Sequence, residues 1–219
     1  MPRMRYSLIV FDWDGTLIDS TSSIATCIQE AAREMGLRVP DRERASHVIG
    51  LGLQDSLQHA VPDLAPGRYA AFIDAYRRQF LAREDSMGLF AGVTELVASL
   101  HASGYRMAVA TGKSRRGLDR ALDATGLRPY MVATRCADET NPKPHPAMLL
   151  ELMEETGHDA ERLLMIGDTS HDLEMARRAG VDAVAVTYGA HPGDSLRRHS
   201  PLACMDSVAE LQEWLKANG

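Results

Sequence analysis

The chain contains 219 residues, of which 45% are hydrophobic and 25% charged, and its 24 Lys or Arg against 30 Asp or Glu give a formal net charge of −6. These values are typical of a folded protein with one core, or of a core domain with a smaller companion domain. The net negative charge and the lack of a basic stripe make a nucleic-acid partner unexpected. No apolar stretch approaches the roughly 20 residues that span a membrane, and three cysteines without a Cys-x-x-Cys pair favour the reducing cytoplasm over a disulfide framework or a zinc site.

The first 85 residues contain one predicted strand followed by helices only. Residues 7–11 (SLIVF) form a short apolar run that predicts a strand, and Asp12 and Asp14 interrupt it too soon for a signal peptide. From residue 20 to about residue 85 the pattern is helical, and it begins with apolar residues at helical spacing before Gly36. We therefore expect an inserted helical domain in this part of the chain.

Three more apolar runs, at residues 106–110, 163–166 and 183–187, predict further strands. Helical patterns lie between the strands, and each ends before a glycine that can adopt the left-handed conformation. Strands that alternate with helices in this way predict an α/β fold with a Rossmann-like parallel sheet. Its ligands gather at the carboxyl ends of the strands.

The predicted domain boundaries follow from this pattern. We expect an α/β core domain formed by residues 1–18 and 86–219, and a small helical domain formed by residues 19–85. The polar segment 191–200 is predicted to be a surface loop.

Two carboxylates follow the first predicted strand. Asp12 and Asp14 alternate along the chain before Gly15, so both side chains can face one crevice. Two carboxylates held close together repel unless one is protonated or a cation lies between them. The alternative is a solvated Asp-Gly turn, which is common in any protein.

Three later segments add chemistry of the same kind. Thr111 and Gly112 follow the second strand, where a hydroxyl and free amides suit phosphate, although Ser114 also fits a simple helix cap. Lys143 stands among three prolines in a stiff loop. Asp168 and Asp172 follow the third strand, and Asp172 also fits a plain acidic residue at a helix start.

Taken in order, these motifs resemble those of a known family. Asp-x-Asp-Gly-Thr, a Thr after a strand, a Lys among prolines and Gly-Asp-x-x-x-Asp are similar to the four motifs of the haloacid dehalogenase superfamily, and the match covers essentially the whole chain. The helical insertion resembles the small helical cap of that family. Within the superfamily the phosphoglycolate phosphatase branch is the most similar, and the resemblance implies a small-molecule phosphate monoester as substrate.

The resemblance also implies roles for the residues. Asp12 would be the nucleophile that forms an aspartyl-phosphate, and Asp14 the general acid and base, kept protonated by its proximity to Asp12. Thr111, the amide of Gly112 and Lys143 would hold the phosphoryl oxygens.

A divalent cation is expected on charge grounds. Asp12, Asp14, Asp168 and Asp172 against Lys143 leave about three negative charges, which would repel a phosphate dianion. Mg²⁺ suits such oxygen ligands, and the family pattern implies Asp12, the main-chain carbonyl of Asp14 and Asp168 as its ligands. Asp172 either binds the metal through water or orients Lys143.

Two alternative functions stay open, a sugar phosphomutase of the same superfamily and a catalytically silent binding protein on the same fold. The acid at Asp14 disfavours a dehalogenase, which needs no proton donor. Substrate selection is expected from the cap loop at residues 49–53, which equally fits a turn between two helices.

Arg44, His47 and Lys113 are candidate donors to a substrate carboxylate. Trp13 is expected to pack under the strand, and His145, His171 and Cys136 are expected to be structural. The oligomeric state does not follow from the sequence.

Overall fold

The computed structural model describes residues 5–219, and its centre is a parallel sheet with the strand order β3-β2-β1-β4-β5-β6. The strands are β1 Leu8–Phe11, β2 Arg106–Thr111, β3 Met131–Cys136, β4 Leu163–Gly167, β5 Asp182–Val186 and β6 Ala203–Met205. All neighbouring strands pair in parallel. The predicted α/β class and the four predicted strands are confirmed.

Two strands at the edges of the sheet were not predicted. In β3 the residues Thr134 and Arg135 interrupt the apolar run, because an edge strand is only partly buried and accepts polar side chains. β6 has only three residues, all of them partly exposed. Neither strand therefore carries the continuous apolar run that marks a strand buried on both faces.

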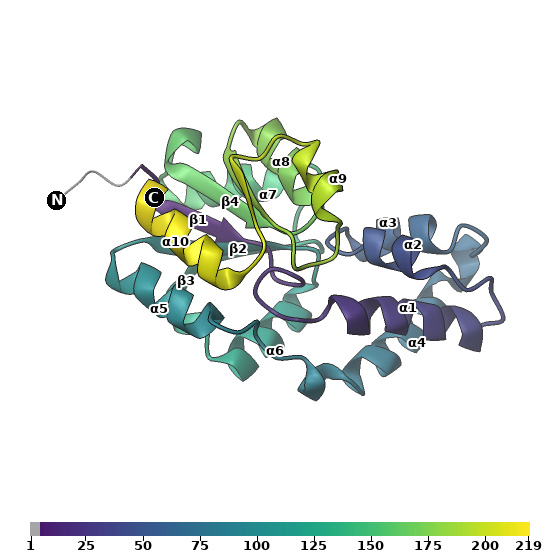
Figure 1. The fold of residues 1–219 in the computed structure, drawn as a ribbon. Helices are drawn as coiled ribbons and strands as arrows, with labels where there is room; N and C mark the ends of the chain where they lie inside the picture. The colour runs from purple at the N-terminus through teal and green to yellow at the C-terminus, as the bar shows by residue number, and fades with distance from the viewer. Residues whose placement is uncertain (1–4) are drawn as a thin grey trace.

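Helices cover both faces of the sheet (Figure 1). The core helices are α5 Val93–Ala102, α6 Arg115–Thr125, α7 Ala147–Thr156, α8 Ser170–Ala179, α9 Gly193–Arg197 and α10 Val208–Asn218. Alternate residues of β1 point to opposite faces, so Ile9 packs with α5, α6 and α10 while Val10 packs with α7 and α8. Short 3₁₀ segments add η1 Pro66–Arg68, η2 Glu84–Ser86, η3 Arg128–Tyr130 and η4 Ala160–Arg162.

The prediction of a surface loop over residues 191–200 was wrong. This segment contains the short helix α9, whose Leu196 is fully buried, and His191 before it is also buried. The prediction failed because the segment is mostly polar and packs against the core through few apolar residues, among them Leu196. The predicted left-handed helix ends are confirmed at Gly126 and Gly157, with φ of 70° and 69°.

The inserted segment forms helices, as predicted. They are α1 Thr21–Glu34, α2 Arg42–His47, α3 Leu53–Ala60 and α4 Tyr69–Leu81, and they lie together at one end of the molecule beyond the carboxyl ends of the strands (Figure 1). Their buried side chains, among them Ile28, Leu57 and Phe72, form a hydrophobic cluster of their own. We call α1 to α4 with their loops the cap. The boundaries at residues 18/19 and 85/86 stay predictions.

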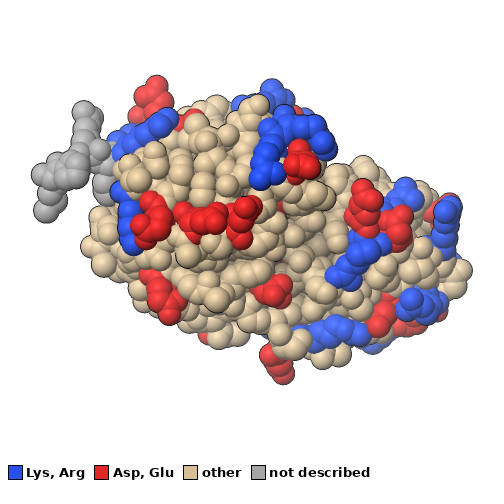
Figure 2. Space-filling model, viewed as in Figure 1, with Lys and Arg blue, Asp and Glu red and all other residues tan. Residues whose placement is uncertain are grey.

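The surface of the cap carries charged side chains of both signs. Figure 2 shows basic and acidic side chains interspersed over the cap on the face viewed. Within residues 5–219 no helix has both the length and the apolar character needed to cross a membrane. Cys27, Cys136 and Cys204 are free thiols, the first two buried. A cytoplasmic location and the lack of a nucleic-acid partner stay predictions.

Candidate active site

The residues predicted to carry chemistry meet at the carboxyl ends of three adjacent strands. Asp12 follows β1, Thr111 ends β2 and Asp168 follows β4, and these strands are neighbours in the order β2-β1-β4. Lys143 reaches the same place from the loop between β3 and α7, and Asp172 reaches it from α8. All five side chains are almost completely buried.

Lys143 forms ion pairs with two carboxylates. Its Nζ lies 2.8 Å from Oδ1 of Asp12 and 2.6 Å from Oδ1 of Asp172. Burial alone would lower the pKa of Lys143, but the charges of Asp12 and Asp172 outweigh it and raise the pKa above its ordinary value. Lys143 therefore stays an ammonium group at neutral pH, and Asp172 contacts it directly, which supports the orienting role over the alternative.

Asp172 also supports the start of helix α8. The amide and hydroxyl of Thr169 donate to Oδ2 of Asp172, at 3.0 and 2.6 Å, in a capping box. The helix-start interpretation and the lysine-orienting interpretation both hold, because each uses a different oxygen. Thr169 therefore holds the carboxylate of Asp172, and Asp12 and Asp172 together hold the ammonium group of Lys143.

Asp12 has one fixed oxygen and one free oxygen. Oδ1 accepts from the amide of Trp13 at 2.6 Å and contacts Lys143, whereas Oδ2 is buried and has no hydrogen-bond partner among residues 5–219. Burial raises the pKa of Asp12 well above its ordinary value, and Asp172 and Asp168 add to the rise while Lys143 opposes it. Trp13 lies in the hydrophobic core, as predicted.

Asp168 is held by two donors. The hydroxyl of Thr16 donates to Oδ1 at 2.8 Å, and the amide of Ala190 donates to Oδ2 at 2.7 Å. Burial, reinforced by the charge of Asp172, raises the pKa of Asp168 to about 7. Gly15 packs against this carboxylate so closely that an added Cβ would lie 2.1 Å from Oδ2.

Three carboxylates form a cluster suited to a cation. One oxygen each from Asp12, Asp168 and Asp172 lies within 4.8 Å of the others, and all three residues are buried. The pKa values of Asp12 and Asp168 are raised, and Oδ2 of Asp12 is unpartnered within residues 5–219, so a hard divalent cation would satisfy this donor set. The residues present therefore fit the expected Mg²⁺.

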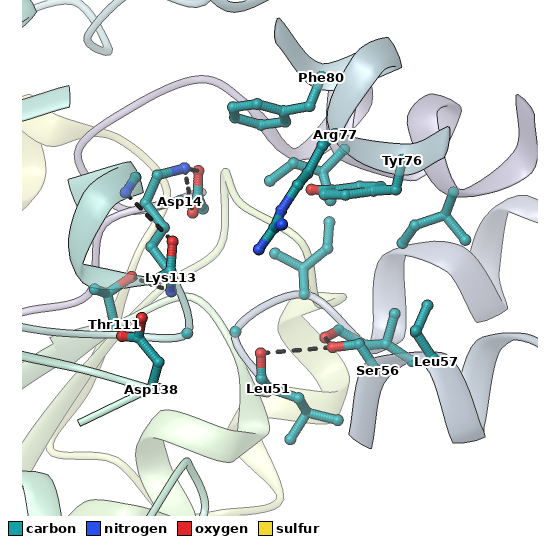
Figure 3. Close-up of a pocket in the computed structure, with 18 of the residues that line it drawn as sticks. Asp14, Leu51, Ser56, Leu57, Tyr76, Arg77, Phe80, Thr111, Lys113 and Asp138 are labelled. Carbon is teal, nitrogen blue, oxygen red and sulfur yellow. Dashed lines mark hydrogen bonds and ion pairs between the residues drawn. The ribbon is translucent and has the colours of Figure 1, made fainter. Parts of the chain in front are cut away.

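Asp14 takes part in different contacts. Both of its oxygens lie 3.0 Å from Nζ of Lys113, and Oδ1 also accepts from the hydroxyl of Ser20 at 2.7 Å. The ring of Phe80 from the cap lies 4.8 Å from the same Nζ (Figure 3). The Asp14 carboxylate thus faces the cavity between core and cap, outside the three-carboxylate cluster, and its predicted protonation by proximity to Asp12 stays a prediction.

The cap loop at residues 49–53 approaches the core closely. An added Cβ on Gly112 would lie 2.6 Å from the carbonyl oxygen of Gly50 and 2.7 Å from that of Leu51. A Cβ on Gly50, whose φ is 90°, would lie 3.7 Å from the free oxygen of Asp12. The loop joins α2 to α3, so it is a turn between two helices, and it also covers the site. Its role in substrate selection stays a prediction.

This close approach predicts a strong effect of Gly112→Ala. The methyl group would push the cap loop away from the turn at Gly112, and displacements of about 1 Å cost on the order of 10²-fold in rate. We expect kcat/KM to fall by about that factor while thermal unfolding changes little. Gly117→Ala is the matched control, because Gly117 lies in helix α6 and its Cβ would meet Ser114 Oγ at 3.4 Å and Lys113 Cβ at 3.9 Å, without any backbone atom of the cap loop. Equal activity of the two variants would contradict the prediction.

A histidine cluster joins the cap to the core. His171 and His191 both contact the carbonyl oxygen of His47 through Nε2, at 2.8 and 3.0 Å, and the rings of His47 and His191 stack 4.7 Å apart. The amide of Ser170 donates to Nδ1 of His191, so Nε2 carries the hydrogen. Burial lowers the pKa of His191 to about 4, which keeps it neutral. His171 contacts the carbonyl oxygen of His47 in the cap, which supports its predicted structural role.

Of the three candidate carboxylate donors, only Lys113 lines the cavity. Arg44 donates to the carbonyl of His59 within the cap. His47 belongs to the histidine cluster. Sequence patterns missed Arg77 of α4, which lines the cavity, because a single arginine in a helix carries no distinguishing signal. No role was predicted for Thr16, although it belongs to the Asp-x-Asp-Gly-Thr motif, and Ser20 has no distinguishing signal in the sequence.

Comparison with known proteins agrees with this geometry. Residues 9–186 match the family model described as haloacid dehalogenase-like hydrolase. The chain is 37% identical to the probable phosphatase IndB of Dickeya dadantii, over 93% of this chain and 91% of that protein. It is 28% identical to phosphoglycolate phosphatase of Colwellia psychrerythraea, over 99% of this chain and 100% of that one.

A solved structure shows the same fold. The crystal structure of a predicted phosphoglycolate phosphatase from Haemophilus somnus superimposes with a TM-score of 0.84 at 25% identity, over 96% of this chain and 98% of that chain. The match includes both the sheet and the cap, because it covers nearly every residue of the two chains. The chain therefore belongs to the haloacid dehalogenase-like hydrolase family, and within it to the phosphatases.

Proposed function

We propose that this protein is a Mg²⁺-dependent phosphatase that hydrolyses a small, phosphoglycolate-like phosphate monoester through an aspartyl-phosphate. One observation carries the proposal. Asp12 lines the cavity, and its Oδ1 is fixed by the amide of Trp13 and by Lys143. Its Oδ2 has no hydrogen-bond partner within residues 5–219. A carboxylate oriented in this way is suited to attack phosphorus.

In the first step, Oδ2 of Asp12 forms a bond to phosphorus as the bond from phosphorus to the leaving oxygen breaks. The leaving alkoxide takes a proton from Asp14, which faces the same cavity. Lys143, the hydroxyl of Thr111 and the amide of Gly112 stabilise the charge on the phosphoryl oxygens.

In the second step, the aspartyl-phosphate is hydrolysed. Asp14, now ionised, removes a proton from water, and the water oxygen bonds to phosphorus as the bond to Asp12 breaks. Lys113 and Ser20 contact the side chain of Asp14 and position it, and their contacts favour its ionised form, which is the base of this second step. The products are inorganic phosphate, the alcohol and the starting enzyme.

Asp12, Asp168 and the main-chain carbonyl of Asp14 would hold Mg²⁺, with Asp172 holding Lys143 beside it. The ion supplies positive charge that offsets the buried carboxylates and the phosphate dianion. A small substrate of the phosphoglycolate type is supported by the relatives, some of which are named phosphoglycolate phosphatase.

Phosphate release from a panel of esters tests the proposal. We expect release from phosphoglycolate to exceed that from glucose 1-phosphate, a nucleoside monophosphate and pyrophosphate, and a chelator to abolish it until Mg²⁺ is restored. Phosphate release that is insensitive to chelator would contradict the proposed dependence on Mg²⁺. No phosphate release from any ester would contradict the proposed phosphatase activity. Interconversion of glucose phosphates would instead indicate the mutase.

A further inference from the structure

The cavity between core and cap is large and mostly apolar on its cap side. Its volume is about 560 Å³, and it extends from Asp12 and Asp14 to the cap helices. The cap wall is formed by aliphatic and aromatic side chains that include Ile24, Ile28, Leu57, Tyr76, Phe80 and Leu81. Cavities of about 300–1,000 Å³ with such walls usually bind ligands of drug size. A two-carbon leaving group would contact little of this wall.

Arg77 projects into the cavity from the cap. Figure 3 shows its guanidinium in the space between the core residues Asp14 and Lys113 and the cap loop residue Leu51. No ion pair or hydrogen bond of Arg77 occurs among residues 5–219. Its neighbour Arg78 differs, since it pairs with Glu34 at 2.5 Å outside the cavity.

The other charges of the cavity leave Arg77 without a counter-ion. Two of the cations that line the cavity are already paired, Lys113 with Asp14 at 3.0 Å and Arg120 with Glu84 at 3.3 Å. Arg116, which lines the cavity from α6, also lacks an ion pair within the described part of the chain. Of the lining acids, Asp12 pairs with Lys143, whereas Asp138 accepts from the amide of Arg115 and forms no ion pair within residues 5–219, so one unpaired acid stands against the two unpaired arginines. The cavity thus offers unpaired positive charge beyond the phosphoryl site.

We propose that the leaving group of the preferred substrate combines an apolar body with a carboxylate, and that Arg77 is the specificity-determining residue that binds this carboxylate. The inference rests on the proposed phosphatase function and refines its substrate class, because the ester keeps the carboxylate of phosphoglycolate but places it on a larger, apolar body. A planar guanidinium matches a carboxylate with two parallel hydrogen bonds. The apolar body packs against the cap wall, where burial of each methylene stabilises binding.

Two matched pairs of alkyl phosphates test the two parts of the inference. Ethyl phosphate and phosphoglycolate have small leaving groups, and only phosphoglycolate carries a carboxylate. Benzyl phosphate and 4-carboxybenzyl phosphate have larger, apolar leaving groups, and only 4-carboxybenzyl phosphate carries a carboxylate. We expect benzyl phosphate to exceed ethyl phosphate in kcat/KM by at least ~10-fold. We expect the carboxylate of 4-carboxybenzyl phosphate to add a further ~10- to 100-fold over benzyl phosphate.

Three variants locate the carboxylate site. In Arg77→Gln the ratio of kcat/KM for 4-carboxybenzyl over benzyl phosphate should fall towards one, and in Arg77→Lys it should recover in part. Arg78→Gln is the matched control, with the same charge change one residue along α4, and it should keep the wild-type ratio. Each ratio compares two esters with the same protein preparation. A smaller fraction of folded enzyme lowers both kcat/KM values equally and leaves the ratio unchanged.

The outcomes separate this inference from the proposed function. If wild-type protein releases no phosphate from any of the four esters with Mg²⁺, the proposed function fails. If it releases phosphate but Arg77→Gln keeps the wild-type ratio, or benzyl phosphate is no better than ethyl phosphate, only the present inference is overturned. A fall of the ratio in Arg78→Gln as well would assign the effect to net charge and would also overturn it.

Discussion

Asp12→Asn is expected to lower kcat by on the order of 10⁴-fold or more, because the amide has the shape of the carboxylate but does not attack phosphorus. The fold should survive. The amide oxygen can still accept from Trp13 and lie against Lys143, and the substitution removes a buried charge that the structure already disfavours, as the raised pKa of Asp12 indicates.

Single-turnover kinetics with acid quenching is the measurement that checks this. Wild-type protein should trap ³²P from substrate in a hydroxylamine-sensitive linkage, and the Asp12→Asn variant should trap none. Asp19→Asn is the matched control, because Asp19 is an exposed residue seven positions along the chain. An Asp12→Asn variant that keeps more than about a tenth of the wild-type kcat would contradict the assignment of the nucleophile.

Lys143→Met is expected to destabilise the protein by about 3–5 kcal/mol near pH 8. Lys143 is fully buried and lies between Asp12 and Asp172, so its loss leaves two buried carboxylates without a counter-ion. Methionine fills much of the same volume, so the loss of charge dominates over the loss of packing.

The loss should shrink as the pH falls. Without Lys143, burial and Asp172 act on Asp12 unopposed, so the pKa of Asp12 rises further above its unfolded value. A carboxyl group whose folded pKa is raised binds protons more tightly in the folded state, so acid favours folding relative to neutral pH. The difference between variant and wild type is therefore smaller at about pH 5.5 than at about pH 8.

Denaturant unfolding at both pH values, with chelator present, measures this difference. Lys216→Met is the control, since Lys216 pairs only with Glu213 on the exposed face of α10 and should change stability by less than about 0.5 kcal/mol. If the free energy of unfolding of Lys143→Met lies within about 1 kcal/mol of the wild-type value at about pH 8, the prediction is wrong, and the buried ion pairs of Lys143 do not stabilise the fold.

The sequence by itself determined the fold class and the residues of the site that directly follow the strands. Strands buried on both faces appear as apolar runs, and the chain must place the residues after them at one edge of a parallel sheet. Asp12, Thr111 and Asp168 were therefore predicted together, and the structure brings them together. The helical cap was visible as a break in the alternation of strand and helix.

Only the tertiary structure decided which side chains touch. The Asp14 contact with Lys113 joins residues 99 positions apart, and Lys143 meets Asp172 although no local pattern links them. Arg77 belongs to the cavity only because the packing of the cap brings α4 to the cavity wall. Local spacing determines which face a residue occupies within its own element, whereas the packing of distant elements determines its partners. Partner choice therefore could not be derived from the sequence, even where the residues themselves could.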